Sequence, residues 1–67
     1  MNLQLNEMRA GSKVMVRGDF GMGRAELVTV DDTEDDIKNG RAGICYTKAD
    51  GDERWAYLSQ VSKVVTF

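Results

Sequence analysis

Hydrophobic and polar residues alternate in several short runs of this chain, and β-branched residues are frequent among the hydrophobic ones. Val14 and Val16 alternate with other residues in 13–17, 24–30 is rich in Val and Thr, and 62–67 has a similar composition. Alternation with period two and β-branched residues are typical of half-buried strands. The sequence therefore predicts strands over these three ranges.

Two further strand-like runs, 41–47 and 53–58, flank Asp50-Gly51. An Asp-Gly pair between two such runs is a strong signal for a β-hairpin with a type I′ turn. That turn needs a positive φ at both central residues, which Asp tolerates and Gly adopts without steric cost. We therefore expect a tight hairpin here.

Helical signals are confined to residues 33–38. Thr33 is a suitable N-cap with acidic residues in the first turn, and Asn39-Gly40 would stop the helix. Residues 58–61 are typical of one short turn before the last strand. Apart from such a connection, the sequence predicts at most one short helical turn.

Five short strands in 67 residues are too few for a two-sheet sandwich. They favour a small, strongly bent barrel, which removes most exposed strand edges. We expect one domain over residues 1–67, in which 1–10 form a loosely ordered N-terminal segment. The expected core consists of apolar residues at alternate strand positions: Val14, Val16, Leu27 or Val28, Val30, Ile44, Leu58, Val61, and Val64 or Val65.

The order of connections resembles that of the SH3-like small-barrel superfamily, which includes Tudor and KOW modules. A long glycine-containing loop follows the first strand, a polar loop the second, a tight hairpin the third and a short turn the fourth. The resemblance covers residues 10–67 and implies an all-β, five-stranded SH3-like barrel. The chain lacks the Ala-Leu-Tyr-Asp-Tyr-like segment, and the Pro before the last strand, of peptide-binding SH3 domains.

Residues 36–41 and 54–61 are also similar to short bacterial and phage proteins, a resemblance that implies no activity. In SH3-like barrels the ligand groove lies between the first long loop and the polar loop after the second strand. The superfamily resemblance thus implies that Phe20 and Trp55 lie beside the segment 31–36.

Charge is concentrated in one place. The chain has 9 basic and 11 acidic residues, for a net charge of −2, and residues 31–36 hold five of the acidic ones. This balance disfavours non-specific DNA binding, which needs an excess of Lys and Arg on one face. The acidic segment is expected to be a solvated loop or a docking surface for cations or basic partners.

Residue types that usually support catalysis are scarce. The chain has no His and one Cys, which excludes an internal disulfide and the usual zinc sites. Cys45 lies mid-strand with no candidate base nearby in sequence. We therefore expect a protein that is not an enzyme and has no metal or cofactor.

Two segments resemble ligand-binding motifs but lack a required feature. Gly18-x-x-Gly21-x-Gly23 precedes a strand, whereas a phosphate loop needs a helix N-terminus. An EF-hand loop starting at Asp31 or Asp32 would need Gly at its sixth position, where Asp36 or Ile37 stands instead. Neither motif predicts a binding site.

The expected location is the cytoplasm, with no membrane association. One unpaired cysteine fits a reducing compartment. No apolar run approaches the length of a membrane span, and residues 1–7 are neither basic nor apolar.

Aromatic residues leave one alternative open. Trp55 and Tyr57 share one face of their strand, and Ala56 and Leu58 share the other. If the aliphatic pair points inward, the aromatic pair forms an outer strip that Phe20, at the tip of the glycine loop, can approach. Otherwise Trp55 is the largest residue of the core.

From these features we expect an interaction module that binds a protein or peptide partner, in particular a basic one, through an aromatic and acidic surface. The expected binding residues are Phe20, Tyr46, Trp55, Tyr57, Asp31, Asp32, Glu34, Asp35 and Asp36.

Two other functions stay open. A nucleic-acid-associated barrel would use a basic strip of Lys38, Arg41, Lys48, Arg54 and Lys63. A self-associating protein, such as a homodimer, would use exposed Met8, Met15 and Met22.

Overall fold

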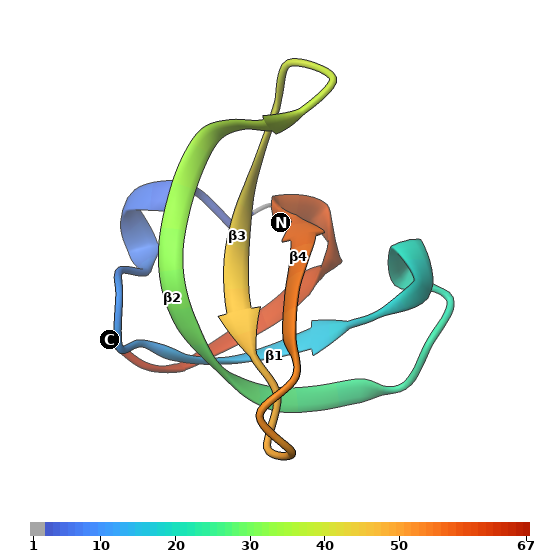
Figure 1. Ribbon diagram of the computed structural model, residues 1–67. Helices are drawn as coiled ribbons and strands as arrows, with labels where there is room; N and C mark the ends of the chain where they lie inside the picture. Colours follow the sequence, from blue (N-terminus) through green and yellow to red (C-terminus); the bar gives the residue numbers. More distant parts are fainter. Residues whose placement is uncertain (1–2) are drawn as a thin grey trace.

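A computed structural model describes residues 3–67 as five antiparallel strands in one sheet (Figure 1). The strands are β1 (Lys13–Arg17), β2 (Ala25–Lys38), β3 (Arg41–Thr47), β4 (Glu53–Tyr57) and β5 (Val61–Thr66). Their order in the sheet is β4-β3-β2-β1-β5, so β4 and β5 are edges and the sheet is not closed by strand pairing. The predicted all-β class and the five strands are confirmed.

Among residues 3–67, helical structure is limited to three single 3-10 turns, η1 (Leu5–Glu7), η2 (Asp19–Gly21) and η3 (Leu58–Gln60). The expected turn at 58–61 is therefore present, but the limit of one further helical turn is wrong. In residues 3–67 no helix has the length and apolar character needed to cross a bilayer.

The long strand β2 determines the shape of the molecule. Its first half pairs with β1, its second half pairs with β3, and a register shift after Val30 leaves Asp31 without a cross-strand partner. Such a bulge bends a strand, and Figure 1 shows β2 curving so that β1 crosses behind β3 and β4. The acidic segment 31–36 is thus part of a strand, and both the expected loop and the expected helical turn there are wrong.

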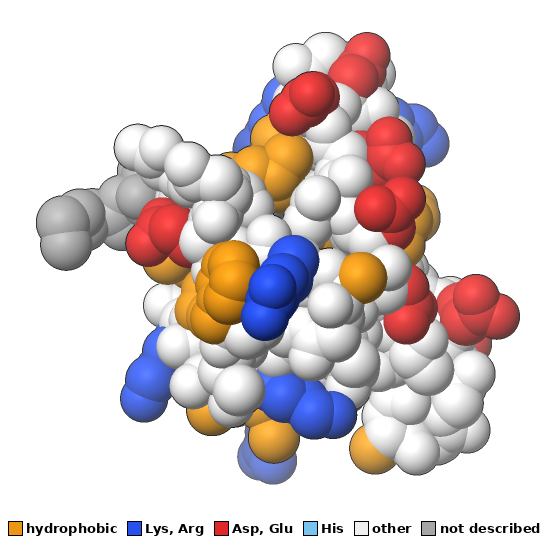
Figure 2. All heavy atoms as spheres, turned by 90° about the vertical axis from the view of Figure 1, so that its left-hand side faces the viewer, with side chains coloured by type: hydrophobic (Ala, Val, Ile, Leu, Met, Phe, Trp, Pro, Cys, Tyr) orange, Lys and Arg blue, Asp and Glu red, His pale blue; other side chains and the backbone are white. Residues whose placement is uncertain are grey.

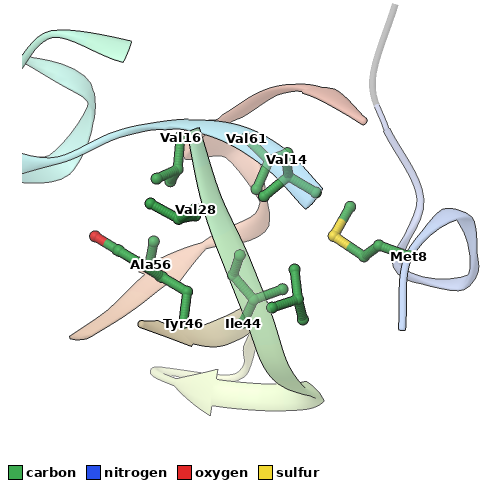
Figure 3. Close-up of a cluster of buried hydrophobic side chains, with 9 residues drawn as sticks. Met8, Val14, Val16, Val28, Ile44, Tyr46, Ala56 and Val61 are labelled. Atoms are coloured by element: carbon green, nitrogen blue, oxygen red, sulfur yellow. The ribbon is translucent and has the colours of Figure 1, made fainter. Parts of the chain in front are cut away.

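The core lies inside this bend (Figure 3), where the inward residues of the strands meet. Its buried members are Met8, Val14, Val16, Val28, Val30, Ile44, Tyr46, Ala56 and Val61. Most of the predicted core is confirmed, and the structure resolves its two alternatives. Val28 is buried while Leu27 is 53% exposed, and Val64 packs against the core while Val65 is 49% exposed.

Residues near the N-terminus contribute to this core. Met8 is buried, so its expected exposure is wrong, and Leu3 and Leu5 pack against the same cluster. Buried Ser12 accepts a hydrogen bond from the Arg9 N–H and donates one to a Phe67 oxygen. The expectation of loose order at 1–10 is untested at residues 1–2, which lie outside the described residues, while 5–7 form a 3-10 turn.

The two Gly-containing hairpin turns differ from the prediction. Asn39 and Gly40 have φ values of 56° and 70°, as a type I′ turn requires. At Asp50-Gly51 only Gly51 has a positive φ, and its N–H donates to the Lys48 carbonyl at 2.9 Å. The predicted hairpin is present, but it has a three-residue loop closed by a glycine bulge, so the predicted type I′ turn is wrong at this position.

Gln60 joins the unpaired edge of β4 to β1. Its Oε1 accepts the Tyr57 N–H at 2.9 Å, and its Nε2 donates to the Arg17 carbonyl at 2.7 Å. A buried amide that satisfies two backbone groups in this way holds the strand ends together where no ladder pairing exists.

Candidate functional site

Phe20, Trp55 and Tyr57 form one cluster, which we call the aromatic cluster. Ring centroids lie 6.2 Å apart for Phe20 and Trp55, 6.3 Å for Phe20 and Tyr57, and 5.1 Å for Trp55 and Tyr57. Two of these pairs are edge-to-face, a favourable geometry for aromatic rings. The loop after β1 and the strand β4 thus meet at one place.

Trp55 and Tyr57 point to the side of the sheet opposite the core, as the register of β4 with β3 requires. Ala56 is opposite Ile44, and both side chains are fully buried, so the neighbours of Ala56 on β4 must point to the other face. Trp55 is 37% exposed, whereas Tyr57 is only 8% exposed. The outward orientation left open by the sequence is therefore the one observed.

Tyr57 is covered by the end of the β2–β3 hairpin. The Arg41 guanidinium lies 4.0 Å from the Tyr57 ring centroid, and Asn39 Nδ2 donates to Tyr57 Oη at 3.0 Å. The Lys38 ammonium lies 5.4 Å from the Trp55 ring centroid. Two ring faces of the cluster thus already attract cations of the same chain.

Phe20 is held in an unusual backbone conformation. Asp19 and Phe20 have φ values of 50° and 56°, followed by Gly21 at 94°. The left-handed region costs a non-glycine residue about 1–2 kcal/mol, yet this loop leaves Phe20 74% exposed. Strained residues that present a side chain to solvent are concentrated at functional sites.

Acidic residues of β2 share the outward side with the aromatic cluster. Asp32 is opposite Cys45, which is opposite Trp55, and directly opposed residues point to the same side of a sheet. In the next outward row Glu34 is opposite Gly43 and then Tyr57. We call this side of β2, β3 and β4 the outer face: acidic on β2, small in the middle and aromatic on β4.

The remaining acidic residues of β2 are also exposed. Asp31 accepts a hydrogen bond from Thr47 Oγ1 at 2.6 Å, and Asp36 accepts the Gly40 N–H at 2.9 Å. Figure 2 shows acidic side chains along one side of the molecule, with most of the visible basic ones lower down. Within residues 3–67, no carboxylate of 31–36 forms an ion pair and no group of three potential ligands could hold a metal ion.

The carboxylates of residues 31–36 affect the pKa of Cys45. Partial burial raises the pKa of its thiol, and the negative charges of Glu34, Asp32 and Asp31 raise it further. The thiolate is thus disfavoured at neutral pH, which makes Cys45 a poor nucleophile. On the outer face, Cys45 therefore acts as a small neutral side chain between the carboxylates of β2 and the aromatic rings of β4.

Gly43 is the other small residue of the outer face, and the sequence provided no reason to select it. A Cβ added there would overlap the Ala56 carbonyl oxygen and Cγ2 of Ile37. Ile37 therefore packs on the glycine, which brings the hairpin end with Lys38, Asn39 and Arg41 against β4. The sequence signal for the hairpin end itself was Asn39-Gly40, since an Asn-Gly pair predicts a type I′ turn.

Tyr46 is separate from the outer face. It is buried in the core, and burial raises the pKa of its hydroxyl. Tyr46 and Ile44 alternate with Cys45 and point inward, so Tyr46 does not belong to the outer face. It lines a hollow of about 300 Å³ between the loop after β1 and the edge of β4, together with Phe20 and Trp55.

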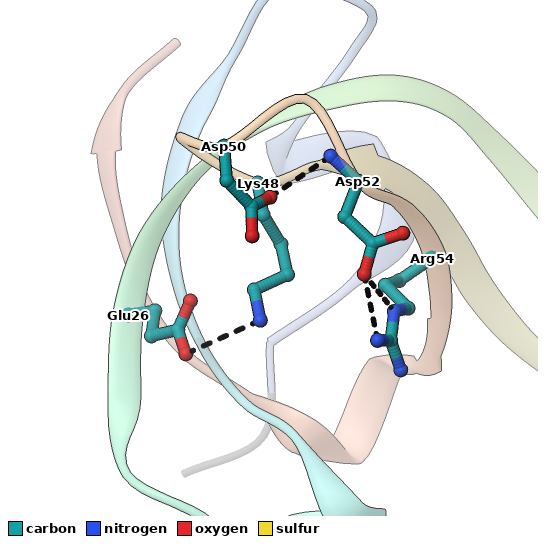
Figure 4. Close-up of polar contacts among 5 residues, drawn as sticks. All are labelled: Glu26, Lys48, Asp50, Asp52 and Arg54. Atoms are coloured by element: carbon teal, nitrogen blue, oxygen red, sulfur yellow. Dashed lines mark hydrogen bonds and ion pairs between the residues drawn. The ribbon is translucent and has the colours of Figure 1, made fainter.

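Charged groups beside this hollow neutralise one another (Figure 4). Lys48 pairs with Glu26 at 3.8 Å, and Arg54 pairs with Asp52 at 2.6 Å. The hydrogen bond to Asp52 raises the pKa of Arg54, which keeps it charged. This region has no unbalanced charge comparable to that of β2.

The five cations considered for a nucleic-acid strip lie in three places. Lys38 and Arg41 are on aromatic rings, Lys48 and Arg54 are ion-paired at the hollow, and Lys63 is opposite Met15 on the outward side of β1.

Comparisons with known proteins give no relative: no protein-family model, curated protein or solved structure matches this chain.

Proposed function

We propose that this protein is a non-catalytic interaction module, built as an SH3-like small barrel, that binds a basic segment of a protein partner on its outer face. The observation that carries the proposal is the order of residues across the sheet, from carboxylates on β2 to Trp55 on β4. A Lys or Arg side chain lying across Cys45, between Asp32 and Trp55, would meet negative charge on one side and an aromatic ring on the other.

The energetics favour several contacts over one strong site. An exposed cation–π contact contributes about 0.5–1 kcal/mol, and an exposed ion pair contributes less than about 1 kcal/mol. Binding would therefore need a segment with two or more cations along β2. Phe20 adds apolar contact area next to Trp55.

Substitution of Lys38 offers a specific test of this proposal. Its ammonium occupies the neighbourhood of the Trp55 ring, so it competes with an incoming cation for the same π face. Removal of Lys38 is expected to strengthen the binding of a basic peptide, whereas a purely structural Lys38 would give no such gain.

The experiment is a fluorescence titration, since Trp55 is the one tryptophan of the chain. The probes are an Arg- and Lys-rich peptide and a Glu-rich peptide of equal length, at low and high salt. Salt-sensitive binding of the basic peptide alone is expected, stronger with Lys38→Ala and weaker with Glu34→Gln. Glu53→Gln, an exposed charge at the start of β4, is the matched control.

Two results would contradict the proposal. One is equal binding of both peptides, which would remove the role of charge. The other is the absence of any binding by the folded protein at millimolar basic peptide.

A further inference from the structure

The outward side of β1 carries a second surface, opposite in charge to β2. Val14 and Val16 are buried, so Lys13, Met15 and Arg17 point outward from β1. Met15 is opposite Leu27 of β2 on one side and Lys63 of β5 on the other. We call these five residues the basic face.

No cation of the basic face is ion-paired among the described residues, although Asp31 lines a shallow hollow together with Lys13 and Leu27. Lys13 Nζ donates to Thr29 Oγ1 and Arg17 donates to the Gly23 carbonyl, and within residues 3–67 neither they nor Lys63 form an ion pair. The strand residues directly opposite β1 on this side are Thr29, Leu27, Ala25, Lys63 and Thr66, none of them acidic.

The basic face is also partly apolar. Leu27 is 53% exposed although it lies in the middle of a strand, and Met15 beside it is half-buried. A phosphate backbone would neutralise the cations but leave these apolar side chains in water. A protein surface can cover both, which favours a protein occupant.

The chain itself has a surface of matching size and opposite charge. Asp31 to Asp36 spans about 17 Å and Lys13 to Arg17 about 13 Å at the usual rise of a strand. The carboxylates of residues 31–36 have no cationic partner among the described residues, whereas Glu26, in the first half of β2, pairs with Lys48. Both surfaces are exposed strand faces, and they lie on different halves of the bent sheet.

We infer that the occupant of the basic face is a second copy of this chain, which docks there through the acidic strand half of its outer face. This inference rests on the proposed function, because the outer face of one copy then takes the basic segment of the next. The contact joins two different surfaces, so it is head-to-tail and leaves one free surface of each kind at the ends of an assembly.

The first test is the salt dependence of the oligomeric state, measured by sedimentation velocity of the full chain at several protein concentrations. Charge pairs at the protein surface are screened beyond about 10 Å at about 0.1 M salt. Concentration-dependent oligomers are therefore expected at low salt and monomers at high salt. A protein that remains monomeric at low salt and hundreds of micromolar concentration would overturn the inference.

Two charge-reversed variants give the decisive test. Lys13→Glu with Lys63→Glu removes the basic face, and Glu34→Lys with Asp35→Lys removes the acidic partner surface. Neither Glu34 nor Asp35 has a hydrogen bond or ion pair of its side chain among the described residues, so the fold should tolerate the change. Glu53→Lys is the control, and circular dichroism verifies folding.

Each double variant is expected to be monomeric alone. An equimolar mixture is expected to associate again, because the unchanged acidic surface of one variant is opposite in charge to the unchanged basic face of the other, and the two reversed surfaces are also opposite in charge. Failure of the mixture to associate, or self-association of either variant at the wild-type level, would overturn the inference. Binding of a labelled oligonucleotide to the basic face of a protein that does not self-associate would overturn it as well.

The same variants separate this inference from the proposed function. Lys13→Glu with Lys63→Glu should bind the basic peptide as the wild type does, whereas Glu34→Lys with Asp35→Lys should not. Peptide binding without self-association would overturn the second-copy inference alone. Absence of peptide binding in all variants would contradict the proposed function.

Discussion

The two halves of β2 are one continuous strand with different physical character. In the first half, Val28 and Val30 are buried and every residue from Ala25 to Thr29 is opposite a residue of β1. The second half pairs with β3 alone, contains five exposed acidic residues and loses its register between Glu34 and Lys38. Packing thus holds the first half.

The second half is held by its pairing with β3 and by a few specific contacts near its end. Ile37 packs on Gly43, Asp36 accepts the Gly40 N–H, and Asn39 reaches Tyr57. These contacts bend the hairpin end over β4, where Lys38 and Arg41 meet the aromatic cluster. The comparison teaches that a charged strand half with little buried surface can be kept in a sheet by pairing with one neighbouring strand and by contacts at its tip.

The largest expected loss of stability comes from Gly43→Ala, which fills the space that Ile37 occupies. In Gly43→Ala the new Cβ would overlap both Ile37 and the Ala56 carbonyl, so strands β2 and β4 must shift. Overpacking typically costs 1–3 kcal/mol, and with backbone in the clash we expect a loss of about 3 kcal/mol in urea unfolding. Gly18→Ala is the control, because a Cβ there meets nothing within 4 Å; equal stability of the two variants would refute this account of the anchor.

Truncation of an inward residue in each half compares the halves directly. Val30→Ala deletes buried carbon and leaves a cavity, so we expect a loss of about 2 kcal/mol. Thr33→Ala, at the half-buried inward position of the acidic half, should cost about 0.5 kcal/mol. Thermal unfolding followed by circular dichroism measures both, and a larger effect of Thr33→Ala would reverse the comparison.

Replacement of the turn residue tests the anchor at its tip. Asn39→Ala loses the hydrogen bond to Tyr57 Oη. Alanine also tolerates the φ of 56° at this position less well than asparagine does. We expect a loss of about 1–2 kcal/mol in unfolding free energy. Asn39→Gly keeps the backbone conformation but not the hydrogen bond, so it should recover part of this loss; no difference between the two would exclude a backbone contribution.

The smallest effect concerns Cys45 and the carboxylates around it. Because its pKa is raised in the folded protein, reaction with Ellman's reagent should be slower near pH 8 than in denaturant. Glu34→Gln should lower that pKa and speed the reaction, while Glu53→Gln should not. A rate unaffected by Glu34→Gln would exclude a contribution of the Glu34 charge to the raised pKa of Cys45.

Linkage gives the sign of the accompanying stability change. A raised pKa in the folded state favours the protonated thiol, so this contribution is fully present below the unfolded pKa of Cys45. It is lost as the pH rises through the higher folded value, so unfolding should become easier on the alkaline side.

Sequence reasoning succeeded where local pattern and packing agree. Alternation of Val14 and Val16, or the β-branched run ending at Val30, indicates both the strand and its buried side. It failed at 31–36, because acidic residues have low strand propensity and propensity gives way to pairing with a neighbouring strand. It also assigned the type I′ turn to Asp50-Gly51 and used Asn39-Gly40 only as a helix stop.

For the candidate site, the sequence predicted conditionally an outer strip of Trp55 and Tyr57, which Phe20 can approach, with the acidic residues 31–36 beside it. It could not find Ile37 on Gly43 or the cations over the rings, since these contacts depend on where the β2–β3 hairpin folds relative to β4. Tyr46 was expected among the binding residues, and the structure buries it beside Ile44, where it lines a hollow together with Phe20 and Trp55.

The sequence by itself determined the all-β class, the strand positions outside the acidic segment and most of the core, because side-chain alternation is a local property of each strand. Only the tertiary structure decided the bend of β2, the outward side of β4 and the grouping of carboxylates, Cys45 and Trp55 in one row. Those features depend on register between strands, which is set by the packing of residues distant in the chain.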